Sequence, residues 1–264
     1  MSFLDWLAGK NNPKLPKSEY LYGTRHLIVL GIVLVSAVVL SLILRNKSQK
    51  TKKIFFKICA SIFLFFEIAQ RIVNLVFADS YSFSWVMQKL LPLYFCSIAV
   101  VCIIIAIFTN FQPLINATAI MGLLVTTAYL LFPATGLNKT YISFDAFYSI
   151  SSHCFGFVVS VLLITTRYAK FEFKDMWKTF VIFGIIIAYG LLTSLVFFPN
   201  TDDYVFILKN PLEFESIIPY PIIYILFLGA WISLFYVAEF SIGKIKQKRK
   251  EKKSIEKKDS PINS

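Results

Sequence analysis

Seven long, almost uncharged apolar stretches constrain this chain more than any other feature. They cover about 27–44, 54–77, 90–108, 114–132, 144–166, 177–198 and 217–240. A helix needs about 20 apolar residues to cross the ~30 Å hydrocarbon core of a bilayer. The stretches also lack the alternation of a membrane β-barrel. The sequence therefore predicts an all-α integral membrane protein with seven transmembrane helices.

Lys and Arg concentrate in alternate connections: after the first stretch, after the fifth, and after the seventh. Six acidic residues lie in or beside the other connections: Asp79, Asp145, Asp202, Asp203, Glu213 and Glu215. The positive-inside rule then places the N-terminus outside and the C-terminus in the cytoplasm. We expect an external leader (1–25), a transmembrane domain (26–240) and a basic, disordered cytoplasmic tail (241–264). The Lys-, Ile- and Phe-rich composition suggests a bacterium of low G+C content. We therefore expect the protein in a bacterial plasma membrane.

The basic tail predicts a contact with anionic lipid. It lacks the interleaved aromatic residues and the folded module of a nucleic-acid-binding protein, so no nucleic-acid partner is predicted. All four cysteines lie within the apolar stretches and the chain has two histidines. This pattern predicts neither a disulfide framework nor a metal site, and no cofactor.

A cysteine and a histidine inside the apolar stretches are the candidate catalytic residues. Cys96 lies in Leu90–Ser97 and His153 in Tyr148–Cys154. Ionisable groups are costly in a bilayer and mark functional sites, and a thiol with an imidazole can perform covalent catalysis. The alternatives are a packing role for the cysteine and an interhelical hydrogen bond for the histidine. Ser97, Ser151 and Ser152 are alternative hydroxyl groups.

Glu67, Arg71 and Asn74 are spaced i, i+4, i+7, so they share one helix face, with the Glu and Arg in the favourable ion-pair order. This pair either locks helix packing or lets Arg71 contact an anionic headgroup. Counting ~1.5 Å per residue from the outer helix ends places Glu67, Arg71, Cys96 and His153 in the outer half of the bilayer. His26 and the loop 200–204 lie toward the same side.

Three motifs resemble those of a known family: Leu91-Pro92-Leu93-Tyr94-Phe95-Cys96-Ser97, Ser152-His153, and the run from Asp203-Tyr204 to Leu208, with His26 near the first helix start. Over roughly 20–240 the chain resembles the YwaF-like integral membrane family and its animal relative, a transmembrane ether-phospholipid acyltransferase. The resemblance implies seven helices and acyl transfer between phospholipids, with a Cys96 nucleophile and a His153 partner. Tyr94 and Ser97 depart from the family pattern, which often has His and Asp there.

The leading hypothesis is an enzyme that transfers or hydrolyses lipid acyl groups, with a membrane phospholipid or lysophospholipid as substrate. Its expected substrate contacts are Arg71, Glu67, Asn74, His26, Tyr94 and Tyr204. The alternatives are a transporter or binding module for a small polar or anionic solute, and a non-catalytic membrane scaffold. The sequence shows neither an inverted repeat nor a pair of Gly/Pro-broken helices, which transporters often have.

Overall fold

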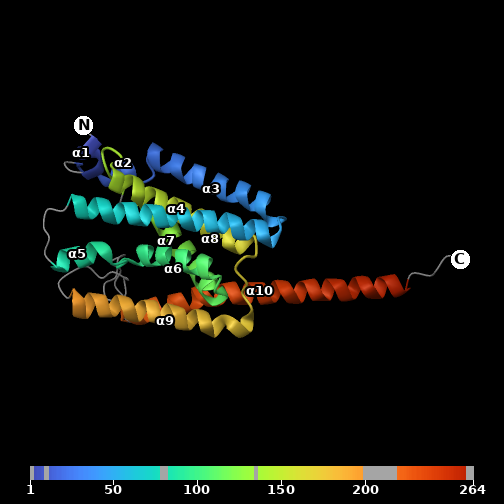
Figure 1. Cartoon of the computed structure of the whole chain (residues 1–264). Helices are drawn as coiled ribbons and strands as arrows, with labels where there is room; N and C mark the ends of the chain where they lie inside the picture. The colour runs from blue at the N-terminus through green and yellow to red at the C-terminus, as the bar shows by residue number, and fades with distance from the viewer. Residues whose placement is uncertain (1–2, 9–11, 78–82, 134–135, 199–218, 260–264) are drawn as a thin grey trace.

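A computed structural model shows a bundle of long helices lying side by side (Figure 1). It describes residues 3–8, 12–77, 83–133, 136–198 and 219–259, and every element in them is helical apart from one isolated antiparallel bridge. The helices are α1 (Phe3–Ala8), α2 (Lys17–Tyr20), α3 (Thr24–Arg45), α4 (Gln49–Val76), α5 (Phe83–Leu90), α6 (Phe95–Thr109), α7 (Gln112–Leu131), α8 (Phe144–Thr165), α9 (Met176–Leu192) and α10 (Tyr220–Asp259). A 3-10 turn (Phe173–Asp175) precedes α9, and a π-helical turn (Thr193–Phe197) follows it.

Six of the described helical segments are long and apolar enough to cross a membrane. They are Thr24–Arg45, Gln49–Val76, Gln112–Leu131, Phe144–Thr165, Phe173–Phe197 and Tyr220–Ile245. Their outward faces carry large exposed aliphatic and aromatic side chains, as contact with lipid requires. The chain is therefore a multi-pass, all-helical membrane protein.

The third apolar stretch differs from its prediction as one continuous helix over 90–108. Its helix is interrupted: α5 ends at Leu90, and α6 begins at Phe95 after an extended Tyr94. Pro92 lies in this break, because it has no N–H to donate and disfavours helical geometry at Leu91. The 15 residues of α6 extend about 22 Å, less than the ~30 Å of a bilayer core.

Helix α7 lies at the centre of the bundle and packs against α6, α8, α9 and α10. More than half of its apolar window is buried. The approach of α7 to α8 depends on Gly122, because a Cβ atom there would lie 2.3 Å from the Ser160 hydroxyl oxygen. Helices α3 and α4 then pack on α8, and α4 also packs on α6. This arrangement brings one end of α4, α6, α7 and α8 together.

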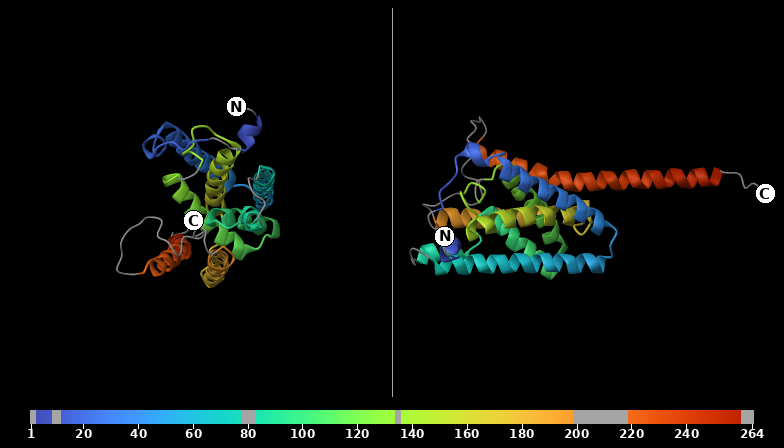
Figure 2. Two further views of the ribbon diagram at one scale, coloured as in Figure 1. Left: turned by 90° about the vertical axis from the view of Figure 1, so that its left-hand side faces the viewer. Right: turned by 90° about the horizontal axis from the view of Figure 1, so that it is seen from above.

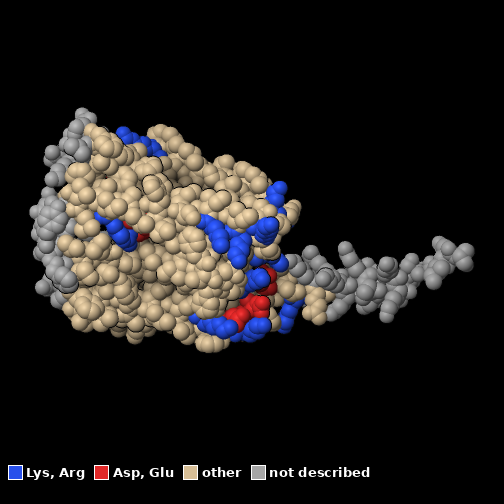
Figure 3. Space-filling model, viewed as in Figure 1, with Lys and Arg blue, Asp and Glu red and all other residues tan. Residues whose placement is uncertain are grey.

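Lys and Arg gather at the end of the bundle from which α10 emerges, and the middle of the visible face is almost free of them (Figure 3). The buried Lys52 is part of this basic end. Its ammonium donates to the carbonyls of Thr166 (2.9 Å) and Arg45 (3.2 Å), at the C-termini of α8 and α3. Helix C-termini leave carbonyls without partners and favour a nearby cation, so Lys52 ties both helices to α4.

The leader is docked onto the bundle at the opposite end. Asn12 exchanges hydrogen bonds with the backbone of Tyr141, and the Trp6 indole donates to the Ile142 carbonyl (2.7 Å). A bridge pairs Lys14 with Lys139. The described leader residues therefore form a strap over the connection between α7 and α8.

The basic segment after the seventh apolar stretch is helical over most of its length. Composition suggests disorder for 241–264, whereas α10 continues without interruption to Asp259. Figure 2 shows this extension leaving the bundle along the direction of the helices. Lys and Glu are common in this segment and are good helix formers, so they propagate an existing helix at little cost.

Candidate functional site

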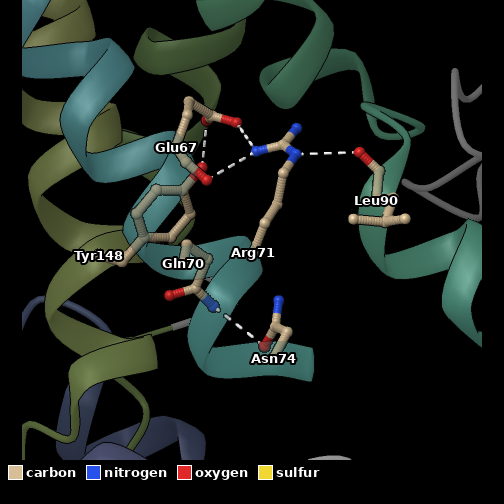
Figure 4. A network of polar contacts seen from close by, with 6 residues as sticks. All are labelled: Glu67, Gln70, Arg71, Asn74, Leu90 and Tyr148. Atoms are coloured by element: carbon tan, nitrogen blue, oxygen red, sulfur yellow. Dashed lines mark hydrogen bonds and ion pairs between the residues drawn. The ribbon is translucent and has the colours of Figure 1, made fainter. Parts of the chain in front are cut away.

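A buried ion pair forms the centre of the candidate site (Figure 4). It lies toward the C-terminal end of α4, away from Lys52 near the start of the helix. Glu67 is 4% exposed. One of its carboxylate oxygens accepts a hydrogen bond from the Arg71 guanidinium, and the other accepts one from the Tyr148 hydroxyl of α8. The i, i+4 pair predicted from the sequence is confirmed, and its carboxylate links α4 to α8.

Arg71 also reaches the break between α5 and α6. Its Nε donates to the Leu90 carbonyl (2.9 Å), and Nη1 donates to the Glu67 backbone carbonyl (3.1 Å). The described residues offer no partner to the two N–H groups on Nη2, and the side chain is 22% exposed. The guanidinium therefore keeps one edge that could receive an anionic oxygen.

A polar chain continues one turn along α4. The Gln70 amide nitrogen donates to Asp145 Oδ1 (2.9 Å) and, at 3.4 Å, to Asn74 Oδ1. Gln70 is 5% exposed, and its Oε1 atom has no partner among the described residues. Asn74 thus lies on the face predicted for it, held through Gln70 instead of directly by Arg71.

Cys96 lies in the first turn of α6, directly after the break. The side chain is half-buried, and α6 packs against α4 and α7. The first N–H groups of a helix have no intrahelical partner, and the N-terminus favours negative charge. The N-terminus of α6 therefore favours a thiolate at Cys96, whereas burial of the sulfur opposes it.

The His153 imidazole is held in one orientation by two contacts. Its Nδ1 lies 2.6 Å from the Ser149 carbonyl, and a carbonyl only accepts, so Nδ1 carries the proton. The Tyr129 ring stacks on the imidazole, with centroids 3.9 Å apart and planes at 13°. No hydrogen bond from the described residues reaches Nε2, including any from Cys96. In its neutral form the ring thus presents Nε2 as a base.

Tyr129, on α7, joins the site by stacking on His153. Tyr129 and Tyr148 are not among the site residues predicted from the sequence. Both are phenol hydroxyls inside apolar stretches, where an unpaired polar group is costly, and this signal alone could have drawn attention to them.

A cleft of about 180 Å³ lies between α4 and α8 and ends at this network. Its lining residues are Ile62, Phe63, Phe66, Glu67, Phe147, Tyr148, Ser151, Ser152 and Phe155. Glu67 and Tyr148 supply its polar end. Cys96 and His153 are not among the lining residues, so the cleft meets the site through the Glu67 carboxylate.

The remaining predicted residues lie elsewhere. His26 is buried, and both ring nitrogens are engaged: Nε2 donates to the Leu130 carbonyl (2.7 Å) and Nδ1 accepts from the Tyr22 N–H (3.0 Å). Tyr94 is the largely exposed residue before α6. Tyr204 lies outside the described residues. Within the described parts of the chain, no three His, Cys, Asp or Glu side chains are placed to hold a metal ion.

Comparison with known proteins identified one family. The model of the TMEM164 family matches residues 21–238, which is most of the chain and includes every residue of the described site. No curated protein and no solved structure matched the chain.

Proposed function

We propose that this chain, which belongs to the TMEM164 family, is a membrane enzyme that acts on lipid acyl esters by transfer or hydrolysis. Cys96 is the nucleophile and His153 is the base. One observation supports the proposal: Cys96 at the N-terminus of α6, His153 on α8 with an unprotonated Nε2 and Arg71 on α4 with an unused edge lie on helices that pack against one another, and Arg71 donates to Leu90 just before the break that precedes Cys96. These are the groups that acyl transfer from a phospholipid needs.

The reaction begins when His153 Nε2 takes the thiol proton of Cys96. The thiolate attacks the ester carbonyl carbon, and the N–H groups of the first turn of α6 stabilise the resulting oxyanion. The carbon–oxygen bond then breaks, and the imidazolium gives its proton to the departing lysophospholipid alkoxide. A second lysophospholipid or a water molecule attacks the acyl thioester, loses its proton to His153 and releases the thiol. The nucleophile–base hydrogen bond, absent here, can form on substrate binding.

Arg71 supports this chemistry by binding the substrate phosphate. Its Nη2 edge points away from Glu67, which holds the guanidinium from the other side (Figure 4). A phosphate oxygen bound there would be anchored close to the first turn of α6, because Arg71 Nε already donates to Leu90 beside the break.

The membrane orientation is also part of the proposal. We infer that the basic end faces the cytoplasm and that the site lies in the outer half of a cell membrane. The alternation of basic and non-basic connections supports this orientation. In this arrangement α5, the break and α6 together form the seventh crossing.

The experiment uses the purified full chain in phospholipid nanodiscs that contain an acyl-labelled phospholipid and a lysophospholipid acceptor. Transfer products and an acyl adduct on Cys96 are measured by mass spectrometry. Cys96→Ser and His153→Ala should lose turnover while unfolding at the wild-type temperature. Cys102→Ala is the matched control, because it alters another half-buried cysteine of α6. Full turnover by Cys96→Ser would exclude the proposed nucleophile.

The break in the third apolar stretch favours a second candidate, the binding or transport of a small anion. In transporters, interrupted helices direct their half-helix N-termini at anionic substrates. This candidate predicts uptake of phosphate or a small carboxylate into proteoliposomes that Arg71→Met abolishes and Cys96→Ala leaves unchanged. Under the lipid acyl proposal, Cys96→Ala abolishes acyl turnover. Uptake of phosphate or a small carboxylate then depends on neither Arg71 nor Cys96.

A further inference from the structure

Two pairs of phenylalanines connect α4 and α8, and the cleft lies between them. The Phe63 and Phe155 rings, 4.7 Å apart, close its inner side, where Phe63 is 2% exposed. The Phe66 and Phe147 rings, 5.9 Å apart, lie on the outer side, where Phe147 is 41% exposed. The cleft is thus closed toward the core and bordered by aromatic side chains toward the membrane.

Both walls come from helices that are long enough to cross the membrane, so the outer side of the cleft faces lipid chains. The α4 wall is formed by Ile62, Phe63, Phe66 and Glu67. The α8 wall has Tyr148, Ser151, Ser152 and Phe155 at i, i+3, i+4 and i+7, which is one helix face. Ile62, at the rim, is 39% exposed.

The cleft has one polar end and a mostly apolar body. Its volume of about 180 Å³ equals roughly six liquid-water volumes of ~30 Å³. A methylene group has a similar size, so several methylenes of a hydrocarbon chain fit. Water is a poor occupant because it needs two to four polar partners. The Ser152 hydroxyl already donates to the Ser149 carbonyl (3.1 Å), and the Glu67 carboxylate accepts from Arg71 and Tyr148. Among these described lining residues, the Ser151 hydroxyl is the polar group that is left for water.

We propose that this cleft is the binding site for one acyl chain of a membrane phospholipid, which enters sideways past Phe66 and Phe147. The ester end of the chain then lies at Glu67, beside Cys96, and the phosphate lies at the free edge of Arg71. The inference deepens the proposed function, on which the role of the bound chain as substrate rests. Binding itself requires only the cleft.

The test is photo-crosslinking in nanodiscs that contain a small fraction of phosphatidylcholine with a diazirine on one acyl chain. The full-length Cys96→Ala variant is used, so that turnover cannot remove the probe. After irradiation, adducts are mapped by peptide mass spectrometry. We expect adducts on the cleft residues of α4 and α8 in excess over those on the exposed face of α3, which contacts bulk lipid only.

Two substitutions change the cleft in opposite directions. Ser151→Trp fills it and should abolish the cleft adducts. Phe147→Ala removes an exposed ring from the outer side and should increase them, with no loss of fold expected at so exposed a position. Phe108→Trp is the control, because Phe108 is a similarly exposed ring (44%) on α6, outside the cleft. Phe108→Trp should leave the amount of cleft adducts unchanged.

Equal labelling of α3 and the cleft, unaffected by Phe147→Ala, would overturn the inference. The outcome is separable from that of the proposed function. Cleft labelling in a chain whose wild type shows no acyl turnover would retain the acyl-chain site and reject the enzyme. Turnover without cleft labelling would retain the enzyme and reject this site.

Discussion

Replacing Gly122 by Ala tests the close packing of α7 on α8, which positions His153 against Tyr129. The new Cβ would lie 2.3 Å from the Ser160 hydroxyl oxygen, about 1 Å closer than an ordinary contact. Overpacking of this kind costs about 1–3 kcal/mol. The Ser160 hydroxyl is buried with no partner in the described structure, so Ser160→Ala should cost nothing. In the double variant the nearest atoms are 3.5 Å away, and the destabilisation should disappear.

The free energies of unfolding are measured by denaturant titration of the purified chain in bicelles. The double-mutant cycle should give a coupling energy of about 1–3 kcal/mol. Gly31→Ala is the control, because nothing lies within 4 Å of its Cβ position in α3. It should be neutral or slightly stabilising. Additive effects of Gly122→Ala and Ser160→Ala, or a fully stable Gly122→Ala single variant, would refute the reasoning.

Three further predictions follow from described contacts. Glu67→Gln should cost about 1.5–3 kcal/mol in the same titration, because Arg71 loses a charge-assisted hydrogen bond; a change below about 0.5 kcal/mol would mean that water replaces the carboxylate. Lys52→Met should lower the free energy of unfolding by about 1–3 kcal/mol, because it leaves two helix-end carbonyls unpaired. Lys57→Met, at an exposed position, should be neutral. Equal effects of the two substitutions would contradict the proposed role of Lys52 in tying α3 and α8 to α4. Trp6→Ala should speed limited proteolysis of the leader, and unchanged cleavage would argue against its docking.

Much of the helical framework could be predicted from hydropathy, because long apolar stretches in a bilayer must form their hydrogen bonds within themselves. The break at 91–94 could not, since Leu91 and Leu93 keep the stretch apolar while Pro92 interrupts only the backbone. The docking of the leader was also missed. It depends on backbone carbonyls of the α7–α8 connection, such as that of Ile142, and these groups leave no mark in the side-chain pattern.

The candidate site was predictable where its contacts are local and not where they cross helices. Glu67 and Arg71 are four residues apart on one helix, so spacing alone predicted their pair. The stacking of Tyr129 on His153 and the bond from Tyr148 to Glu67 join residues on different helices. Such pairs depend on the rotation of each helix about its axis, which an apolar stretch of fairly uniform hydropathy does not specify.

The leader strap has a consequence for the order of assembly during synthesis. The Thr140 hydroxyl donates to the Pro13 carbonyl across 127 positions of the chain. This hydrogen bond cannot form until Thr140 has been synthesised. The leader therefore stays undocked until α7 and the connection between α7 and α8 have emerged. Protease protection of the leader, measured in arrested nascent chains of increasing length, would therefore show the chain length at which the leader docks onto the bundle.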